Sequence, residues 1–136
     1  MDRKERAFWN RLRTSLSTKV FVKRIENGVA AGDPDVFLMK GGKVVWVELK
    51  WADIPKRITS KLLKKGAVRV DQINWHLEYA WKKGTSYVLI GTEDKDYLMP
   101  GRIADRLNDM TLEEIEKEAL CAHRSIGSVL EEVLFK

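Results

Sequence analysis

Several residue types that support common protein chemistries are scarce in this sequence. It has one cysteine, Cys121, and two histidines among 136 residues. A single cysteine cannot form an intramolecular disulfide, and no Cys/His cluster typical of a zinc site is present. There is no Gly-rich phosphate loop or nucleotide-cofactor fingerprint. Internal repeats and low-complexity segments are also missing, so the pattern is that of an ordinary globular chain.

Long apolar runs are missing as well. No stretch approaches the ~20 apolar residues that a membrane-spanning helix needs, and the charged N-terminus is not a signal peptide. We therefore expect a cytoplasmic protein. With 44% hydrophobic and 33% charged residues, the chain is long enough for one domain with its own core. A net charge of +5 is compatible with a polyanionic partner, although charge alone is weak support for one.

What is present is a pair of apolar, β-branched-rich runs on either side of Gly41-Gly42. Gly-Gly between two such runs predicts a β-hairpin with a two-residue turn. If Lys40 and Lys43 flank the turn, the register follows by counting outward. The predicted facing pairs are Met39 with Val44, Phe37 with Trp46, and Asp35 with Glu48.

The charged end of this hairpin is its most informative feature. Because side chains alternate faces along a strand, Glu48 and Lys50 point the same way, towards Asp35. Opposed like charges destabilise a sheet, so two facing carboxylates beside one ammonium need a compensating charge. A divalent cation supplies it, and oxygen ligands suit magnesium or manganese. The alternative is an ordinary hairpin with Asp35 as a strand cap and Glu48 and Lys50 as a surface pair.

Pro34-Asp35 followed by Glu48-Leu49-Lys50 resembles the signature of the PD-(D/E)XK nuclease superfamily. Within it, the chain is similar in size to archaeal Holliday junction resolvases and to stand-alone VRR-NUC nucleases of phages. The resemblance implies that Asp35, Glu48 and the Leu49 carbonyl bind one or two Mg²⁺ ions, for which Mn²⁺ can substitute. It further implies that Lys50 orients the attacking water or stabilises developing negative charge. Hydrolysis of DNA would then leave a 5′-phosphate and a 3′-hydroxyl.

Two further acids are candidates for the same cluster. In the archaeal resolvases a glutamate near the start of the first helix joins the metal site, and Glu5 lies at the matching place. The alternative is a first-turn acid stabilised by the helix dipole. Glu26 lies in a loop that returns to the Asp35 end of the hairpin, and it is either a ligand or a solvated acid. Arg24 matches a basic residue of the resolvases at this point.

Residues 51–68 form the most basic segment and have the weakest structural pattern. We predict a mobile basic loop beside the metal site, where a phosphodiester backbone would be gripped. A solvated charge run is the alternative. The candidate DNA-binding cations in or next to this segment are Lys56, Arg57, Lys61, Lys64, Lys65 and Arg69.

The clearest helix is predicted over residues 70–84, ending with Gly84 at the C′ position. VRR-NUC-type nucleases carry a glutamine at the start of this helix near the active site, and Gln72 matches it. Arg69 replaces the serine that often precedes it. We assign His76 no role. The predicted core stripe of the helix comprises Ile73, Leu77, Ala80 and Trp81.

The order of the predicted elements is that of a nuclease core. Helix 3–16, strand 20–25, the two hairpin strands, helix 70–84 and strand 86–91 give an αβββαβ sequence. Segment 97–99 is expected to add an edge strand. Thr111 begins a capping box that opens a helix through about residue 120, and a last helix covers 126–135.

These elements predict a single α/β domain over 1–136. Its restriction-endonuclease-like core covers about 3–99, with a mixed sheet flanked by helices on both faces. A C-terminal helical extension covers about 102–136.

The resemblance favours a metal-dependent endonuclease that cuts branched DNA, a Holliday junction resolvase in particular. Its setting would be repair and recombination in a prokaryotic or phage-infected cell. Paired cuts in a junction make a C₂ homodimer the natural assembly. One alternative is a DNA-binding module of the same fold, or a restriction or repair nuclease subunit that needs a partner. Another is a small-molecule metal enzyme.

Overall fold

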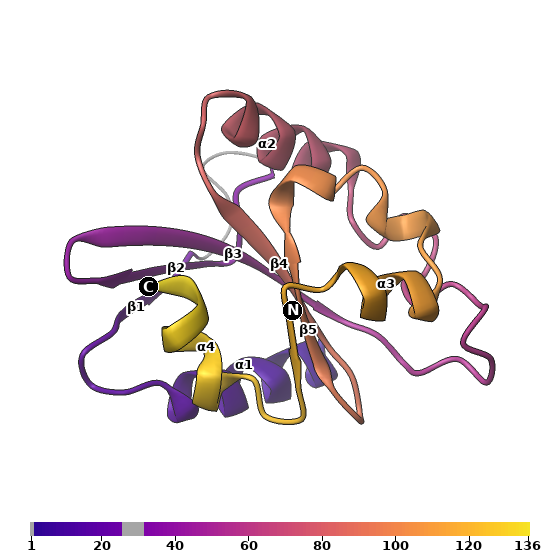
Figure 1. Ribbon diagram of the computed structural model, residues 1–136, viewed down its shortest axis with the longest axis horizontal. Coiled ribbons are helices and arrows are strands. Elements are labelled where there is room, and N and C mark those ends of the chain that lie inside the picture. The colour runs from indigo at the N-terminus through magenta and orange to yellow at the C-terminus, as the bar shows by residue number, and fades with distance from the viewer. Residues whose placement is uncertain (1, 26–31) are drawn as a thin grey trace.

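The structure of the protein is a computed structural model that describes residues 2–25 and 32–136. The αβββαβ order predicted for the first part of the chain is confirmed (Figure 1). Within the described residues, none of the helices combines the length and apolarity needed to cross a membrane. The elements are α1 (Arg3–Ser15), β1 (Phe21–Arg24), β2 (Val36–Lys40), β3 (Lys43–Trp51), α2 (Val70–Trp81), β4 (Ser86–Gly91), β5 (Asp96–Pro100), the 3₁₀ turns η1 (Gly101–Ile103) and η2 (Leu107–Asp109), α3 (Leu112–Glu118), β6 (Cys121–His123) and α4 (Gly127–Leu134).

The sheet is mixed, as predicted, and its strands run in the order β1-β2-β3-β4-β5-β6. β3 and β4 pair in parallel, and the other neighbouring strands of the described residues are antiparallel. A parallel pair needs a crossover connection, and α2 supplies it. The predicted hairpin register is confirmed, because Phe37 faces Trp46 and Met39 faces Val44. Gly41 and Gly42 have φ of +59° and +82°, as a type I′ turn requires.

The strand predicted at 97–99 is confirmed as β5, but the expectation that it is an edge strand is wrong. β5 lies between β4 and β6, because Leu98 faces Cys121 and Tyr97 faces Ala122. The C-terminal part of the chain is therefore not only helical, since it also supplies β6. The three residues of β6 are too few to show an alternating pattern, so only the pairing with β5 defines the strand.

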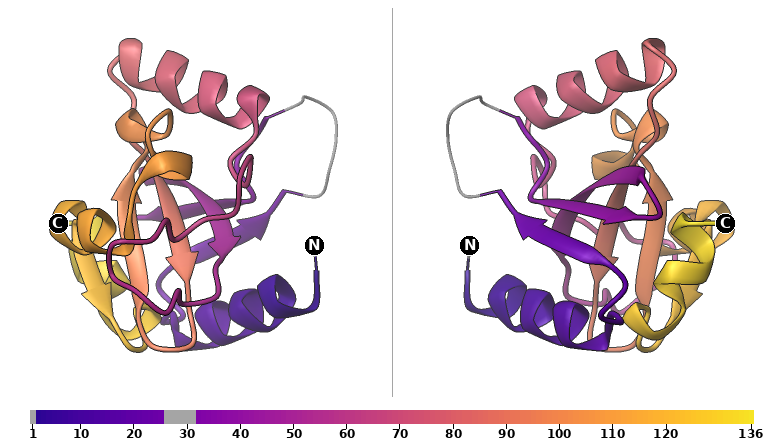
Figure 2. Two further views of the ribbon diagram at one scale, coloured as in Figure 1. Left: turned by 90° about the vertical axis from the view of Figure 1, so that its right-hand side faces the viewer. Right: turned by 90° about the vertical axis from the view of Figure 1, so that its left-hand side faces the viewer.

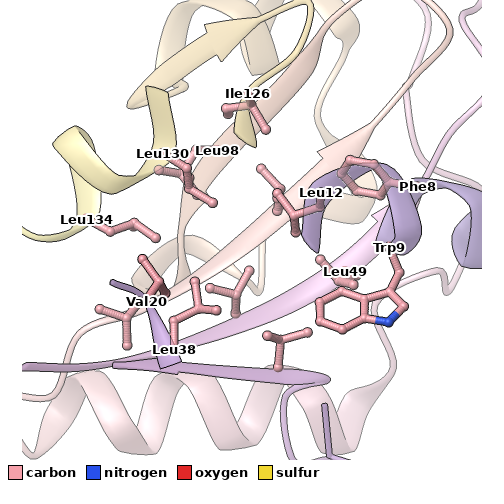
Figure 3. Packing of buried hydrophobic residues seen from close by; sticks show 14 residues of the cluster. Phe8, Trp9, Leu12, Val20, Leu38, Leu49, Leu98, Ile126, Leu130 and Leu134 are labelled. Atoms are coloured by element: carbon pink, nitrogen blue, oxygen red, sulfur yellow. The ribbon is translucent and has the colours of Figure 1, made fainter. Parts of the chain in front are cut away.

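Helices α1 and α4 cover one face of the sheet, and Figure 3 shows how their apolar side chains meet it. The apolar face predicted for the hairpin is buried in this layer. The β2 and β3 side chains that belong to it are Val36, Leu38, Val45, Val47 and Leu49. They pack with Phe8 and Leu12 of α1 and with Leu130 and Leu134 of α4.

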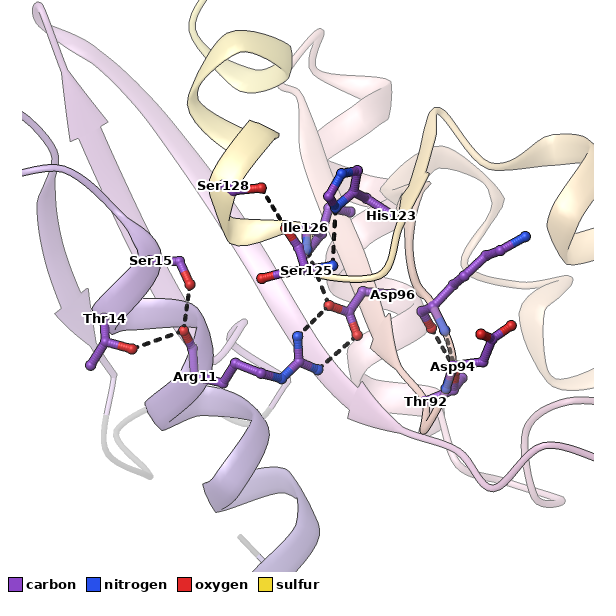
Figure 4. Close-up of polar contacts among 11 residues, drawn as sticks. Arg11, Thr14, Ser15, Thr92, Asp94, Asp96, His123, Ser125, Ile126 and Ser128 are labelled. Atoms are coloured by element: carbon purple, nitrogen blue, oxygen red, sulfur yellow. Dashed lines mark hydrogen bonds and ion pairs between the residues drawn. The ribbon is translucent and has the colours of Figure 1, made fainter.

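A partly buried ion pair joins this layer to the sheet (Figure 4). Arg11 of α1 donates two hydrogen bonds to Asp96 of β5, with N–O distances of 2.7 and 2.9 Å. The side chain of Asp96 is fully buried. The same carboxylate accepts a bond from the backbone of Ile126 at the start of α4. One residue of β5 therefore ties both helices to the sheet.

The opposite face is covered by α2, the two 3₁₀ turns and α3, so helices flank both faces as predicted (Figure 2). The segment between β3 and α2 also packs here, through buried Leu62, Leu63 and Val68. The backbone of Val68 exchanges two hydrogen bonds with the side chain of Asn108. Lys61 forms a β-bridge with Thr111. The expectation of a mobile loop is wrong, because these contacts anchor the segment.

The predicted core stripe of α2 is also wrong. Its fully buried side chains are Gln72 and His76, whereas Trp81 is 83% exposed. The polar side of the helix faces the charged end of β3, and tertiary contacts there override the apolar pattern. Ile73 only partly packs against the second core.

The helix α2 also ends differently from the prediction. Lys83 rather than Gly84 takes the left-handed position, with φ of +71°. Gly84 follows it and packs against Tyr79, whose ring a Cβ at this position would overlap.

The second face of the hairpin is only partly covered. A row of edge-to-face and tilted aromatic contacts runs across it from β1 to α2. Phe21, at the start of the row, is 52% exposed, and Val44 of β3 is 41% exposed. The row comprises Phe21, Phe37, Trp46 and Trp75.

Candidate active site

Asp35 and Glu48 meet at the end of the hairpin that is far from its turn. The ladder between β2 and β3 runs to Val36 facing Val47, so the next residues along the two strands are the two acids. Asp35 accepts a hydrogen bond of 2.8 Å from the backbone N–H of Leu49. The side chain of Glu48 is 1% exposed, and Asp35 is half-buried. The carboxylate pair therefore lies at the margin of the buried layer.

The pKa of Glu48 reflects this arrangement. Burial, followed by the hydrogen bond and negative charge of Asp35, raises it to about 10. The positive charges of Lys50 and Arg69 oppose the shift. With this pKa the Glu48 carboxyl stays protonated at neutral pH when no cation is bound. The nearby positive charge is too small to stabilise its ionised form.

Gln72 links Glu48 to Lys50. Its amide nitrogen donates to Oε2 of Glu48 at 3.0 Å, and its amide oxygen accepts from Nζ of Lys50 at 3.0 Å. The same oxygen accepts from the backbone N–H of Arg69 at 2.9 Å. Nζ of Lys50 lies 3.9 Å from Oε2 of Glu48. The structure thus brings Gln72 together with the carboxylate and the lysine predicted from the sequence.

The backbone conformation at Gly32 allows the segment before Asp35 to approach the start of α2. Gly32 has φ of +88°, and a Cβ there would overlap the backbone carbonyl of Asp71 at the start of α2. Only glycine allows the chain to pass this close to the helix in that conformation. The segment that leads into Asp35 is therefore pressed against the first turn of α2, next to Gln72.

His76 and Ser86 belong to the site, although sequence reasoning missed both. Nδ1 of His76 lies 2.7 Å from Oγ of Ser86, and its Nε2 lies 3.9 Å from Oε1 of Glu48. The ring is fully buried, and burial lowers its pKa to about 4. One signal was available: His76 follows Gln72 by four residues, so both lie on the same face of a helix.

Of the two additional acids predicted for the cluster, Glu5 and Glu26, the structure describes only Glu5. Glu5 is half-buried on α1. Burial raises its pKa, the charges of Asp2 and Asp35 add to the effect, and Lys50 opposes it. Glu5 thus lies within electrostatic reach of the site, but its role as a ligand stays a prediction. Glu26 lies outside the described residues.

Most of the candidate DNA-binding cations are exposed, and Arg24 and Arg69 are the ones that the contacts place near the acids. Arg24 is half-buried in β1, where it faces Val36, the neighbour of Asp35. Lys61 is partly neutralised by Asp109, with an N–O distance of 3.3 Å. The exposed cations from this prediction are Lys56, Arg57, Lys61, Lys64, Lys65 and Arg69.

The donor chemistry of the site fits a hard divalent cation. Among residues 2–25 and 32–136, no three His, Cys, Asp or Glu side chains gather closely enough to hold a metal on their own. The predicted set requires two carboxylates and a backbone carbonyl. Oε1 of Glu48 is buried and has no hydrogen-bond partner among the described residues. A buried carboxylate oxygen without a donor is the group that a cation would satisfy.

Comparison with solved structures finds the same fold in a known protein. The chain is similar to Hjc, a Holliday junction resolvase from the archaeal hyperthermophile Archaeoglobus fulgidus, with a TM-score of 0.57. The match covers 97% of this chain and 99% of Hjc, at 16% sequence identity. The chain has the fold of this resolvase. No protein-family model matches the sequence, and neither does any curated protein. The likeness to Hjc and the αβββαβ order confirm the predicted restriction-endonuclease-like fold.

Proposed function

We propose that the protein is a metal-dependent, structure-specific DNA endonuclease that hydrolyses phosphodiester bonds in branched DNA, and specifically a Holliday junction resolvase. The observation that carries this proposal is the buried Glu48 beside Asp35, with Lys50 held by Gln72 next to the same carboxylate. The fold shared with Hjc supports the same function. The intact set of two acids and a lysine argues against a nuclease-fold module that only binds DNA.

The carboxylates of Asp35 and Glu48, with the Leu49 carbonyl, would hold one or two Mg²⁺ ions. When bound, such an ion neutralises charge on the scissile phosphate and lowers the pKa of a bound water. The deficit of positive charge around Glu48 supports this assignment. Manganese has similar ligand preferences and should substitute.

Lys50 would act on the reacting phosphate. Its ammonium is held by the amide oxygen of Gln72 at 3.0 Å, and the Lys50 residue is only 8% exposed. A fixed ammonium in a largely dry site stabilises developing negative charge more strongly than one in water. Gln72 keeps that ammonium on the side of Glu48 by bonding both groups. Glu5, at the margin of the site, would complete the acidic cluster.

The cations between β3 and α2 would contact the DNA backbone. Anchoring by Leu62, Leu63 and Val68 means that these exposed charges are presented from a defined surface. Arg24 and Arg69 lie nearest the acids, because Arg24 pairs with Val36 and the charge of Arg69 acts on Glu48. Phosphate contacts of this kind position DNA without reading its sequence, as recognition of branched structure requires.

A C₂ homodimer would give the two symmetric cuts that junction resolution needs. The biological setting proposed is recombination and repair in a prokaryotic or phage-infected cell. If the protein is instead a subunit that depends on a partner, it should bind DNA and cut none alone.

The experiment compares cleavage of a labelled four-way junction, a flap and a linear duplex, with Mg²⁺ and with EDTA. The wild type, Glu48→Gln and the control Glu78→Gln are assayed together. Glu78 is an exposed acid on α2 that pairs only with Lys82 among the described residues. Paired, Mg²⁺-dependent cuts near the branch, retained in the control and lost in Glu48→Gln, are expected.

Other outcomes separate the alternatives. Equal cutting of all three substrates would contradict the junction preference and leave a nuclease of another specificity. Salt-sensitive DNA binding without any cutting would overturn the catalytic assignment and favour a binding module or a partner-dependent subunit.

A further inference from the structure

A chain of polar side chains runs from β4 through α2 to the acid of β3. It consists of Ser86, His76 and Glu48, and none of the three residues is more than 5% exposed. Oγ of Ser86 lies 2.7 Å from Nδ1 of His76. Nε2 of His76 and Oε1 of Glu48 are 3.9 Å apart. Among the described residues, neither of these last two atoms has a hydrogen-bond partner.

The imidazole of His76 is tightly held in its place. A Cβ on Gly101 would overlap Oγ of Ser86 and come within 2.8 Å of Nδ1 of His76. The backbone of η1 therefore closes one side of the pair. The Trp75 ring packs against the imidazole with centroids 5.2 Å apart and planes at 78°. An imidazole held in this way points Nε2 in one direction, towards Glu48.

Hydrogen-bond chemistry then determines the tautomer. A carboxylate only accepts hydrogen bonds, so an ionised Glu48 needs a donor opposite Oε1. A neutral imidazole offers that donor when Nε2 carries the hydrogen and the Ser86 hydroxyl donates to Nδ1. The distance of 3.9 Å exceeds a hydrogen bond by about 1 Å, and bonds around catalytic groups are often long before the full complex forms.

We propose that His76, oriented by Ser86, is a positioning residue that holds the Glu48 carboxylate in the orientation required to bind a divalent cation. The inference rests on the proposed function, in which Glu48 is a metal ligand. Gln72 already donates to Oε2, so a donor at Oε1 fixes the plane of the carboxylate from both sides. The second lone pair of Oε1 stays open to the cation. Groups that orient metal-binding side chains in this way affect metal affinity strongly.

The burial of this polar chain supports a role beyond packing. A buried nitrogen and a buried oxygen without partners cost free energy, and an apolar side chain at position 76 would remove the nitrogen's share of that cost. The other buried side chain of α2, Gln72, also points at Glu48. The polar face of α2 is therefore aimed at a single carboxylate.

The test measures Mn²⁺ binding calorimetrically in the absence of DNA, and Mg²⁺ titrations of junction cleavage accompany it. The variants are His76→Phe, which removes both ring nitrogens, Ser86→Ala, and His76→Gln, whose amide can still donate to Glu48. The matched control is His123→Phe, because His123 is exposed on β6. Thermal melting in EDTA confirms that each variant folds.

His76→Phe should raise the Mn²⁺ dissociation constant about 10- to 100-fold. Ser86→Ala should shift it in the same direction by less, and His76→Gln should recover much of the loss. The Mg²⁺ concentration for half-maximal cleavage should follow the same order, while junction binding in EDTA should not change. If His76→Phe fails to fold, Ser86→Ala and His76→Gln decide the question.

Folded His76→Phe and Ser86→Ala variants with wild-type Mn²⁺ affinity would overturn the inference and leave the proposed function intact. A wild type that neither binds Mn²⁺ nor cuts DNA would instead overturn the proposed function, and the inference with it. A loss of melting temperature without a change in Mn²⁺ affinity would mean that His76 is only structural.

Discussion

Glu48 is a buried acid whose pKa departs strongly from that of an exposed carboxyl. Its pKa is raised from 4.5 to about 10, first by burial and then by Asp35. Between these two pH values the folded protein holds a proton that the unfolded chain has lost. The free energy of unfolding therefore falls as the pH rises across that window. The pKa of His76 is lowered from 6.5 to about 4. Between these two values the unfolded chain holds a proton that the folded protein has lost, so this group makes the free energy of unfolding rise with pH.

From this follows a prediction at the residue scale. In EDTA at about pH 8, Glu48→Gln should raise the free energy of unfolding by about 1–3 kcal/mol, the range for relieving a buried, poorly paired polar group. The gain should shrink towards about pH 5, where the carboxyl is protonated in the folded state at little cost. Urea unfolding across this pH range measures it, with Glu78→Gln as the exposed control. If Glu48→Gln were less stable than the wild type at about pH 8, the claim that the buried Glu48 carboxyl destabilises the fold there would be contradicted.

One acidic side chain of β5 forms hydrogen bonds with both α1 and the start of α4. The buried carboxylate of Asp96 accepts two bonds from Arg11 and one from the backbone of Ile126. Removing one partner of a buried ion pair leaves the other charge uncompensated, which is more costly than losing the pair. This contact lies on the face of the sheet opposite α2, so it should govern stability without touching the site.

Arg11→Met should accordingly lower the free energy of unfolding by about 3 kcal/mol. Arg13→Met on the same helix should change it by less than about 0.5 kcal/mol, because Arg13 is exposed. Chemical denaturation measures both values. Divalent-metal affinity of the folded Arg11→Met variant should equal that of the wild type. A reduced metal affinity at full folding would show that this ion pair also fixes the position of α1, and with it Glu5, relative to the other acids.

At the scale of the whole molecule, the charge of +5 is placed unevenly. Exposed cations gather between β3 and α2, directly after the strand that carries Glu48 and Lys50. Their contacts with DNA should be electrostatic and independent of sequence. They should therefore influence how tightly DNA binds more than how fast it is cut.

The double substitution Lys64→Gln/Lys65→Gln should weaken junction binding and lower the slope of log affinity against log salt by about 2, because each lysine would neutralise about one phosphate. Cleavage at saturating DNA should stay within about threefold of the wild type, since neither residue touches the acids. Lys19→Gln is the control: Lys19 precedes β1 at the end where Phe21 pairs with Met39, away from Asp35. An equal weakening by Lys19→Gln would show that the DNA lies elsewhere.

Local patterns determined a large part of this protein. The hairpin register followed from Gly41-Gly42 and the alternation of side chains, because a two-residue turn leaves the strands no freedom to slip. That register alone placed Asp35 opposite Glu48. The capping box of α3 was equally local, with Thr111 and Glu114 bonding each other's backbone N–H groups. Such features depend on residues a few positions apart.

Contacts between distant segments decided the rest. The sequence could not show that β6 would cover β5, or that α2 would bury Gln72 and His76 while exposing Trp81. The parallel pairing of β4 with β3 places Ser86 beside His76, and so behind Glu48. The sequence by itself determined that Asp35, Glu48 and Lys50 lie together at one end of the hairpin. The tertiary structure alone decided what surrounds them, because burial and hydrogen-bond partners are properties of packed segments that no local pattern encodes.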